Sequence, residues 1–193
     1  MNWQPSWRSW LPASLAVCLL LALAVRPAGA EEPLETWILI DTEAYRLDVY
    51  RGYTPIKRFR NIALGSGGAA PLHMEGDATT PLGEFRIVRI NRDSRFHIFL
   101  GLDYPTRVHM ERAWQLGLVD ARTHEAFVSR HHPGGVPPQN TPLGGNIGIH
   151  GIGSGDPLIH HRFNWTRGCI ALTNEQIEQL ARMVGIGTRV FIR

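Results

Sequence analysis

The chain has 193 residues, of which 44% are hydrophobic and 19% are charged, a composition that supports a folded core and excludes a disordered chain. The formal net charge is +3, and two of the 20 basic residues precede residue 31, so the remainder is close to neutral. Because there is also no run of lysine or arginine, the charge argues against nucleic acid as a partner.

The first 30 residues have the pattern of a secretory signal peptide. Arg8 supplies a short positive segment, an apolar run follows over residues 15–25, and Ala28-Gly29-Ala30 is the small-x-small pattern that a signal peptidase requires. The run is too short to span a bilayer comfortably, so cleavage is the favoured interpretation and an uncleaved N-terminal anchor is the alternative. We therefore expect an exported protein of the periplasm or cell envelope, with residues 31–193 as its single domain.

In an exported protein, the number of cysteines indicates whether a disulfide can form. Cys18 lies in the apolar run, so Cys169 is the one cysteine of residues 31–193 and has no partner for an internal disulfide. An unpaired thiol in an oxidising compartment is a liability unless it is buried or used in chemistry.

The pattern of residues 31–193 predicts a strand-dominated domain. Alternating or short apolar runs predict strands over residues 37–40, 45–50, 56–64, 84–90, 97–100, 147–150 and 189–192. Two helices are expected. One covers residues 107–119, and the other follows a capping box with Thr173 as N-cap and Gln176 three residues later. Residues 131–146 hold four prolines and four glycines and are predicted to be loop.

Two segments carry the candidate chemistry. His150 ends an apolar strand and precedes Gly151, and Cys169 follows Gly168 in a turn. Imidazole is the usual partner of a reactive thiolate, so it should lower the pKa of Cys169 below its free value of about 8.5. The glycines allow close approach of substrate, and Gly168 frees nearby backbone amides to face a developing oxyanion. The structural alternative is that Cys169 is a small core residue and His150 a buried, hydrogen-bonded one.

These residues resemble the signature of the L,D-transpeptidase catalytic domain, the YkuD-type family. His150-Gly151 is followed by Thr166-Arg167-Gly168-Cys169-Ile170, with Cys169 nineteen positions after His150. Two earlier segments also resemble family elements: Gly76-Asp77 with Thr80-Pro81-Leu82-Gly83-Glu84-Phe85, and Leu102-Asp103-Tyr104-Pro105. The resemblance covers roughly residues 36–193.

The resemblance implies a mostly-β, β-sandwich-like domain with two short helices that acts on the stem peptides of peptidoglycan. It implies that Cys169 attacks the carbonyl before the terminal D-Ala and forms a thioester, which then passes to an amine or to water. His150 would take the thiol proton, and the carbonyl of Gly151 would orient the imidazole. Amides of Gly168 and Cys169 would form the oxyanion site.

Residues beside the nucleophile are candidates for substrate contact. Arg167 would hold a substrate carboxylate or be structural, and Thr166 replaces the commoner Ser as a local hydrogen-bonding group. Trp165 would pack against substrate or in the core, and the loop with His161 would line the groove or be solvated. One position departs from the family, because many members carry Arg or Asn where this chain has Ala171.

Three alternatives to a transpeptidase stay open. A hydrolase or amidase, such as an L,D-carboxypeptidase or an enzyme that releases a wall-linked lipoprotein, would use the same Cys169 and His150 but admit water. A wall-binding module would keep the fold without turnover. A cysteine protease of another fold would add an Asn or Asp partner and a helix that carries the cysteine. The partners expected are therefore stem peptides, with a wall-linked lipoprotein as a further candidate; the oligomeric state is not indicated.

Nine histidines invite a metal site, but their spacing does not favour one. His131-His132 and His160-His161 are adjacent pairs whose side chains diverge, and neither a His-Glu-x-x-His nor a Cys-x-x-Cys motif is present. We expect no metal and no cofactor.

Overall fold

The computed structural model describes residues 1–2 and 34–193 of the chain. The signal peptide expected over residues 1–30 lies almost wholly outside these residues and stays a prediction. No helix in the described part is long and apolar enough to cross a membrane.

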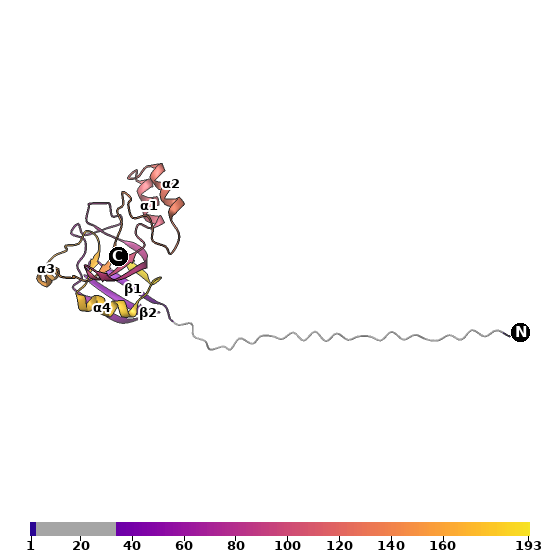
Figure 1. Cartoon of the computed structure of the whole chain (residues 1–193), viewed down its shortest axis with the longest axis horizontal. Helices are drawn as coiled ribbons and strands as arrows, with labels where there is room; N and C mark the ends of the chain where they lie inside the picture. The colour runs from indigo at the N-terminus through magenta and orange to yellow at the C-terminus, as the bar shows by residue number, and fades with distance from the viewer. Residues whose placement is uncertain (3–33) are drawn as a thin grey trace. The chain divides into compact units, whose positions relative to one another are not determined.

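The described part of the chain holds ten strands and four helices (Figure 1). The strands are β1 (Thr36–Asp41), β2 (Arg46–Arg51), β3 (Thr54–Arg60), β4 (Ala69–Ala70), β5 (Thr80–Pro81), β6 (Gly83–Ser94), β7 (His97–Leu102), β8 (Gly148–His150), β9 (Ile170–Ala171) and β10 (Arg189–Ile192). The helices are α1 (Arg107–Gln115), α2 (Ala121–Arg130), α3 (Pro157–Arg162) and α4 (Asn174–Met183). The mostly-β class is confirmed, but there are four helices in place of the two expected.

Eight of the strands form one sheet in the order β3-β2-β1-β10-β6-β7-β8-β9, and β4 pairs with β5 separately. The long strand β6 changes partner along its length, because Gly83–Arg86 pair with β10 and Ile87–Ser94 pair with β7. Its register against β7 shifts twice, and such irregularities bend a strand and increase its twist. The sheet thereby continues to β8 and β9, which adjoin the residues of the predicted site.

The alternation seen in the sequence produces the core. Ile38 and Ile40 of β1 are fully buried, as are residues of the neighbouring strands. Each such side chain stabilises the fold by roughly 1.5–3 kcal/mol relative to an exposed one. On the other part of the sheet, α4 packs against β7 and β8 and buries Ile177 and Leu180. This packing holds β8, which ends in His150.

The helix expected over residues 107–119 is shorter, and a second helix follows it. Gly117 adopts a φ of +71°, a conformation that ends α1 and that glycine adopts without strain. The Asp120 side chain then accepts from the backbone N–H of Thr123 and begins α2, which packs against α1 at one end of the domain (Figure 1). Asp156 begins α3 in the same way.

The capping box predicted for α4 is confirmed. Thr173 Oγ1 accepts from Gln176 N at 3.2 Å, and Gln176 Oε1 accepts from Thr173 N at 3.0 Å. Replacing Thr173 by alanine removes the first bond, so Thr173→Ala should lower the free energy of unfolding by about 1 kcal/mol in urea denaturation. Thr173→Ser keeps the hydroxyl and serves as the control. An alanine variant as stable as the parent would show that the cap contributes nothing.

Candidate active site

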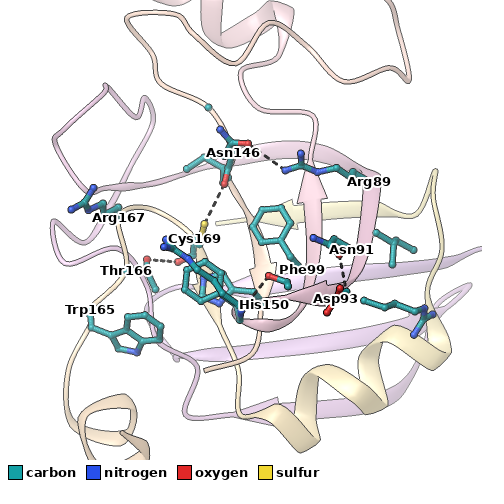
Figure 2. Close-up of a pocket in the computed structure, with 17 residues that line it drawn as sticks. Arg89, Asn91, Asp93, Phe99, Asn146, His150, Trp165, Thr166, Arg167 and Cys169 are labelled. Carbon is teal, nitrogen blue, oxygen red and sulfur yellow. Dashed lines mark hydrogen bonds between the residues drawn. The ribbon is translucent and has the colours of Figure 1, made fainter. Parts of the chain in front are cut away.

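The pairing of β8 with β9 brings His150 and Cys169 together. The two strands are parallel, with Ile149 opposite Ile170 and His150 opposite Ala171. Cys169 directly precedes β9, and side chains two residues apart on a strand share a face. Cys169 therefore lies on the face of Ala171 and beside His150. Both side chains line one cavity of about 1280 Å³ (Figure 2).

His150 is buried and held in one orientation. Its Nδ1 lies 2.7 Å from the carbonyl oxygen of Gly151, and since a carbonyl can only accept, Nδ1 carries the proton. Nε2 is then left as the acceptor of a further proton. Phe96 stacks on the imidazole with 4.2 Å between ring centroids. Burial lowers the pKa of His150 to about 4, so the ring is neutral at pH 7 and able to act as a base.

Cys169 is partly exposed to the cavity but is not stabilised as a thiolate. Its thiol donates to the carbonyl of Asn146, with 3.4 Å between Sγ and the oxygen. Burial raises the pKa of Cys169 to about 11, and a backbone hydrogen bond from Gly148 offsets this only in part. The expectation that the pKa of Cys169 falls below the free value is therefore wrong. The physical reason is that the neighbouring imidazole is itself neutral and gives the thiolate no positive charge.

The turn before Cys169 is fixed by Thr166, which is buried. Thr166 Oγ1 accepts from the amide of Gly168 at 3.1 Å and donates to the carbonyl of Cys169 at 2.6 Å. The Gly168 amide is thus engaged in this structure, and the Cys169 amide is the remaining candidate for the oxyanion site. Thr166 therefore sets the shape of the turn. It also lines the cavity of Cys169, and its contact with substrate stays a prediction.

Gly168 is required by both its conformation and its surroundings. Its φ is +120°, and a Cβ at this position would lie 2.6 Å from the carbonyl oxygen of Thr79 and 2.9 Å from Cδ1 of Ile147. Residues with a side chain are strained at this φ, and the backbone oxygen of Thr79 cannot easily move away.

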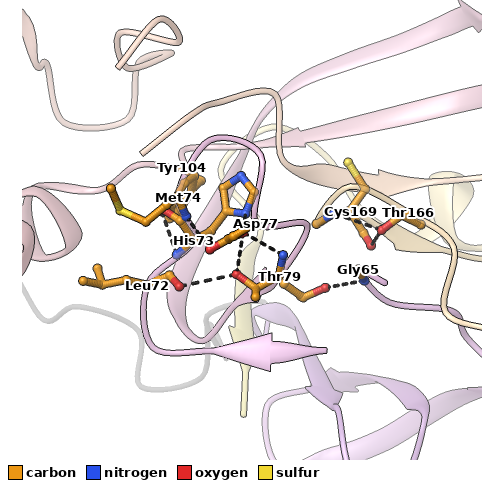
Figure 3. Close-up of polar contacts among 11 residues, drawn as sticks. Gly65, Leu72, His73, Met74, Asp77, Thr79, Tyr104, Thr166 and Cys169 are labelled. Atoms are coloured by element: carbon orange, nitrogen blue, oxygen red, sulfur yellow. Dashed lines mark hydrogen bonds and ion pairs between the residues drawn. The ribbon is translucent and has the colours of Figure 1, made fainter. Parts of the chain in front are cut away.

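The second family segment builds the loop that supports this turn (Figure 3). The Asp77 carboxylate accepts from the amides of Met74 and Thr79, each at 2.8 Å, and from the Thr79 hydroxyl at 2.9 Å. Desolvation opposes ionisation of Asp77, but these hydrogen bonds outweigh it and lower the pKa of the carboxyl. Asp77 therefore fixes the position of Thr79, whose carbonyl packs against Gly168.

His73 is a buried neighbour of the turn that the sequence analysis missed. Its Nδ1 lies 2.9 Å from Oδ1 of Asp77, at an angle too bent for a good hydrogen bond, and its Cε1 would lie 3.2 Å from a Cβ on Gly168. The hydroxyl of Tyr104 donates to the backbone carbonyl of His73 (Figure 3). No motif marks an isolated histidine, so nothing in the sequence indicated this contact.

The substrate-contact candidates separate into two groups. Arg167 and Trp165 line the cavity of Cys169, and Trp165 meets the His150 ring edge-on at 5.9 Å (Figure 2). His161 is exposed and lines a different hollow, so the structure does not bring it to Cys169. Its buried neighbour His160 is closer, because the Trp165 indole N–H donates to His160 Nδ1 at 3.4 Å.

Among residues 34–193, no group of three or more His, Cys, Asp or Glu side chains is placed to hold a metal ion.

The sequence profile of the L,D-transpeptidase catalytic domain matches residues 35–192. The chain belongs to this family. Members are cysteine-dependent L,D-transpeptidases that act on peptidoglycan stem peptides in the cell envelope. A comparison with curated protein sequences gave no match.

Solved structures share the fold of this L,D-transpeptidase domain. A mutant form of the helical cell shape determining protein Pgp2 from Campylobacter jejuni superposes with a TM-score of 0.57 at 20% identity, over 84% of this chain and 48% of that one. Bd1075 from Bdellovibrio bacteriovorus gives a TM-score of 0.54 at 18% identity, over 83% and 48%. The chain thus spans about half the length of these proteins, and at such identities the likeness shows the fold alone.

The raised pKa of Cys169 predicts how fast its thiol reacts. Because thiolate is the reactive form and the pKa of Cys169 is about 11, alkylation by iodoacetamide should be slower at pH 7 than for a free thiol. The rate should keep rising with pH through the alkaline range. Mass spectrometry of Cys169 between pH 6 and 10 would measure it, with the protein unfolded in urea as the control. A rate that already levels off near pH 7 would instead indicate a thiolate–imidazolium pair.

Gly168→Ala should lower the stability of the fold and change the reactivity of the Cys169 thiol. The strained φ alone should lower the free energy of unfolding by about 1–2 kcal/mol, and the contact with Thr79 should displace the turn and change the alkylation rate of Cys169. Gly185→Ala is the matched control, because an added Cβ there meets nothing within 4 Å and its φ lies outside the left-handed region. If the two variants were equally stable and equally reactive, the Gly168 turn would not need glycine.

Proposed function

We propose that the chain is an exported peptidoglycan L,D-transpeptidase with Cys169 as its nucleophile and His150 as its base. The observation that supports this most directly is that the two signature residues line one open cavity, with the imidazole oriented by Gly151. Residues 1–30 would then direct the enzyme to the periplasm or cell envelope.

The chemistry follows from this arrangement. Cys169 Sγ attacks the carbonyl of the stem-peptide residue before the terminal D-Ala, and the thiol proton passes to Nε2 of His150. Expulsion of D-Ala as an amine takes that proton and leaves a thioester on Cys169. An amine of a second stem peptide then attacks the thioester, gives up a proton through His150, and restores the thiol. The Gly151 carbonyl keeps Nδ1–H oriented in the place where other enzymes use a carboxylate.

The protonation states set the timing of proton transfer. With a thiol pKa of about 11 and an imidazole pKa of about 4, the proton rests on the sulfur of Cys169. Transfer to His150 should therefore accompany the attack, when negative charge moves from sulfur to the carbonyl oxygen, and should not precede it. The backbone amide of Cys169 would donate to this oxygen and stabilise its charge.

Hydrolysis of the same thioester is the second candidate. The cavity is wide, at about 1280 Å³, and would admit water as well as an amine. An L,D-carboxypeptidase, or an enzyme that releases a wall-linked lipoprotein, would share every residue named above and differ only in the acceptor.

Mass spectrometry of tetrapeptide muropeptides would test the proposal. The protein should release D-Ala and form a dimer joined through two diamino acids, and Cys169→Ala should abolish both products, since the thioester needs sulfur. Cys169→Ser keeps the size and polarity of the side chain and controls for folding, and thermal unfolding of each variant would be compared. Release of D-Ala without dimers would favour hydrolysis. Untouched muropeptides and untouched lipoprotein-linked sacculi would favour a binding module.

A further inference from the structure

The cavity around Cys169 is strongly cationic. Four arginines line it, Arg89, Arg92, Arg95 and Arg167, together with the single carboxylate of Asp93. None of these arginines forms an ion pair with a carboxylate of residues 34–193. Guanidinium groups without internal counter-charges, gathered in a concave site, favour an anionic ligand.

The four arginines are not equivalent. Arg92 donates to the backbone carbonyl of Ala181 in α4 at 3.2 Å, and Arg95 lies over the ring of Phe96 at 4.7 Å from its centroid. Arg167 is exposed and has no hydrogen-bond partner for its side chain among the described residues. Arg92 is therefore committed to the fold, whereas Arg167 is free to meet a ligand.

Arg89 is held in place beside the nucleophile. Its guanidinium lies 5.3 Å from the centroid of Phe99 and donates to Oδ1 of Asn146 at 3.3 Å. The backbone carbonyl of the same Asn146 accepts the Cys169 thiol. A guanidinium fixed by stacking and by one hydrogen bond keeps further N–H donors for a ligand and loses little freedom on binding. Figure 2 shows Arg89 and Arg167 on either side of Cys169.

The position that departs from the family cannot supply a polar anchor. Ala171 is fully buried, and its backbone N–H and carbonyl are both bonded to Ala63, at 2.8 and 3.0 Å. Arg89 instead lines the cavity of Cys169. It does so from β6, which is two strands away from β8 in the sheet.

We propose that Arg89 and Arg167 each bind a free carboxylate of the donor peptide, one on each side of the scissile amide, so that the enzyme selects peptides whose carboxylates are not amidated. This inference rests on the proposed function of the site. A stem tetrapeptide has the required chemistry when its terminal D-Ala carboxylate lies on the leaving side and the side-chain carboxylate of its diamino acid lies on the acyl side. Successive residues of an extended peptide are about 3.5 Å apart, so two carboxylates that flank the scissile amide fit within one cavity of about 1280 Å³.

Binding to the Cys169→Ala variant tests this without turnover. Calorimetry would compare a synthetic stem tetrapeptide with its terminal carboxamide and with its acyl-side carboxamide. Each amide should weaken binding about tenfold, the usual loss for one charge-assisted pair. In the Arg89→Gln background, one of the two carboxamide peptides should bind as tightly as the free acid. In the Arg167→Gln background, the other carboxamide peptide should do so. Arg92→Gln removes the same charge from the same cavity and should keep both differences.

The outcomes separate this inference from the proposed function. Equal affinity for all peptides, no binding of any, or discrimination that survives in both arginine variants would overturn the carboxylate sites. Loss of discrimination in Arg92→Gln would also overturn them, because the effect would then come from net charge alone. Discrimination without cleavage by the unmodified protein would leave the carboxylate sites standing and remove the transpeptidase. Cleavage without discrimination would support the transpeptidase and overturn the carboxylate sites.

Discussion

The site depends on the register between two very short strands. β8 has three residues and β9 has two, so their own ladder is too small to fix which residue faces which. The register is set by what surrounds them: Ile149 and Ile170 are fully buried, and α4 packs on β8. A shift of one residue would turn Cys169 to the opposite face, away from His150. Burial of two isoleucines is therefore a condition of the chemistry as well as of stability.

The same burial controls the charge of the reacting groups. Desolvation is the largest cause of both pKa shifts, and it acts against the thiolate of Cys169 and the imidazolium of His150 alike. Groups buried in this way stay neutral, and a protonated thiol is less prone to oxidation than a thiolate. Under the proposed mechanism, the thiol loses its proton only as the substrate carbonyl takes up the negative charge. The exposed arginines favour binding of an anionic substrate in the cavity, while the imidazole of His150 stays neutral.

The sequence predicted the features that local pattern controls and missed those set by contacts across the fold. Alternation located the long strands, and a four-residue motif located the cap of α4, because both signals lie in neighbouring residues. β9 is too short to show a period, and α2 was missed because it lies beyond the predicted helix and buries one residue, Phe127, so its sequence shows little apolar periodicity. Cys169 and His150 were singled out by motif, and both line one cavity. The predicted direction of the Cys169 pKa was wrong, because the sequence shows the neighbouring histidine but not how far the fold buries the thiol.

Arg89 shows why a motif underestimates a site. Arg86 follows the alternation of β6 and donates to the carbonyl of Gly187. Arg89 instead follows two successive apolar residues, Ile87 and Val88, where the alternation breaks, and no motif marks that break. The register shift between Ile87 and Arg89 separates the two: Arg86 stays opposite β10, while Arg89 falls opposite Gly101 of β7 and lines the cavity of Cys169. A strand irregularity thus decides which arginine enters the cavity. Position 171 is alanine and offers no polar side chain. The fold instead brings the guanidinium of Arg89 to the cavity of Cys169 from another strand, where it can bind an anionic substrate.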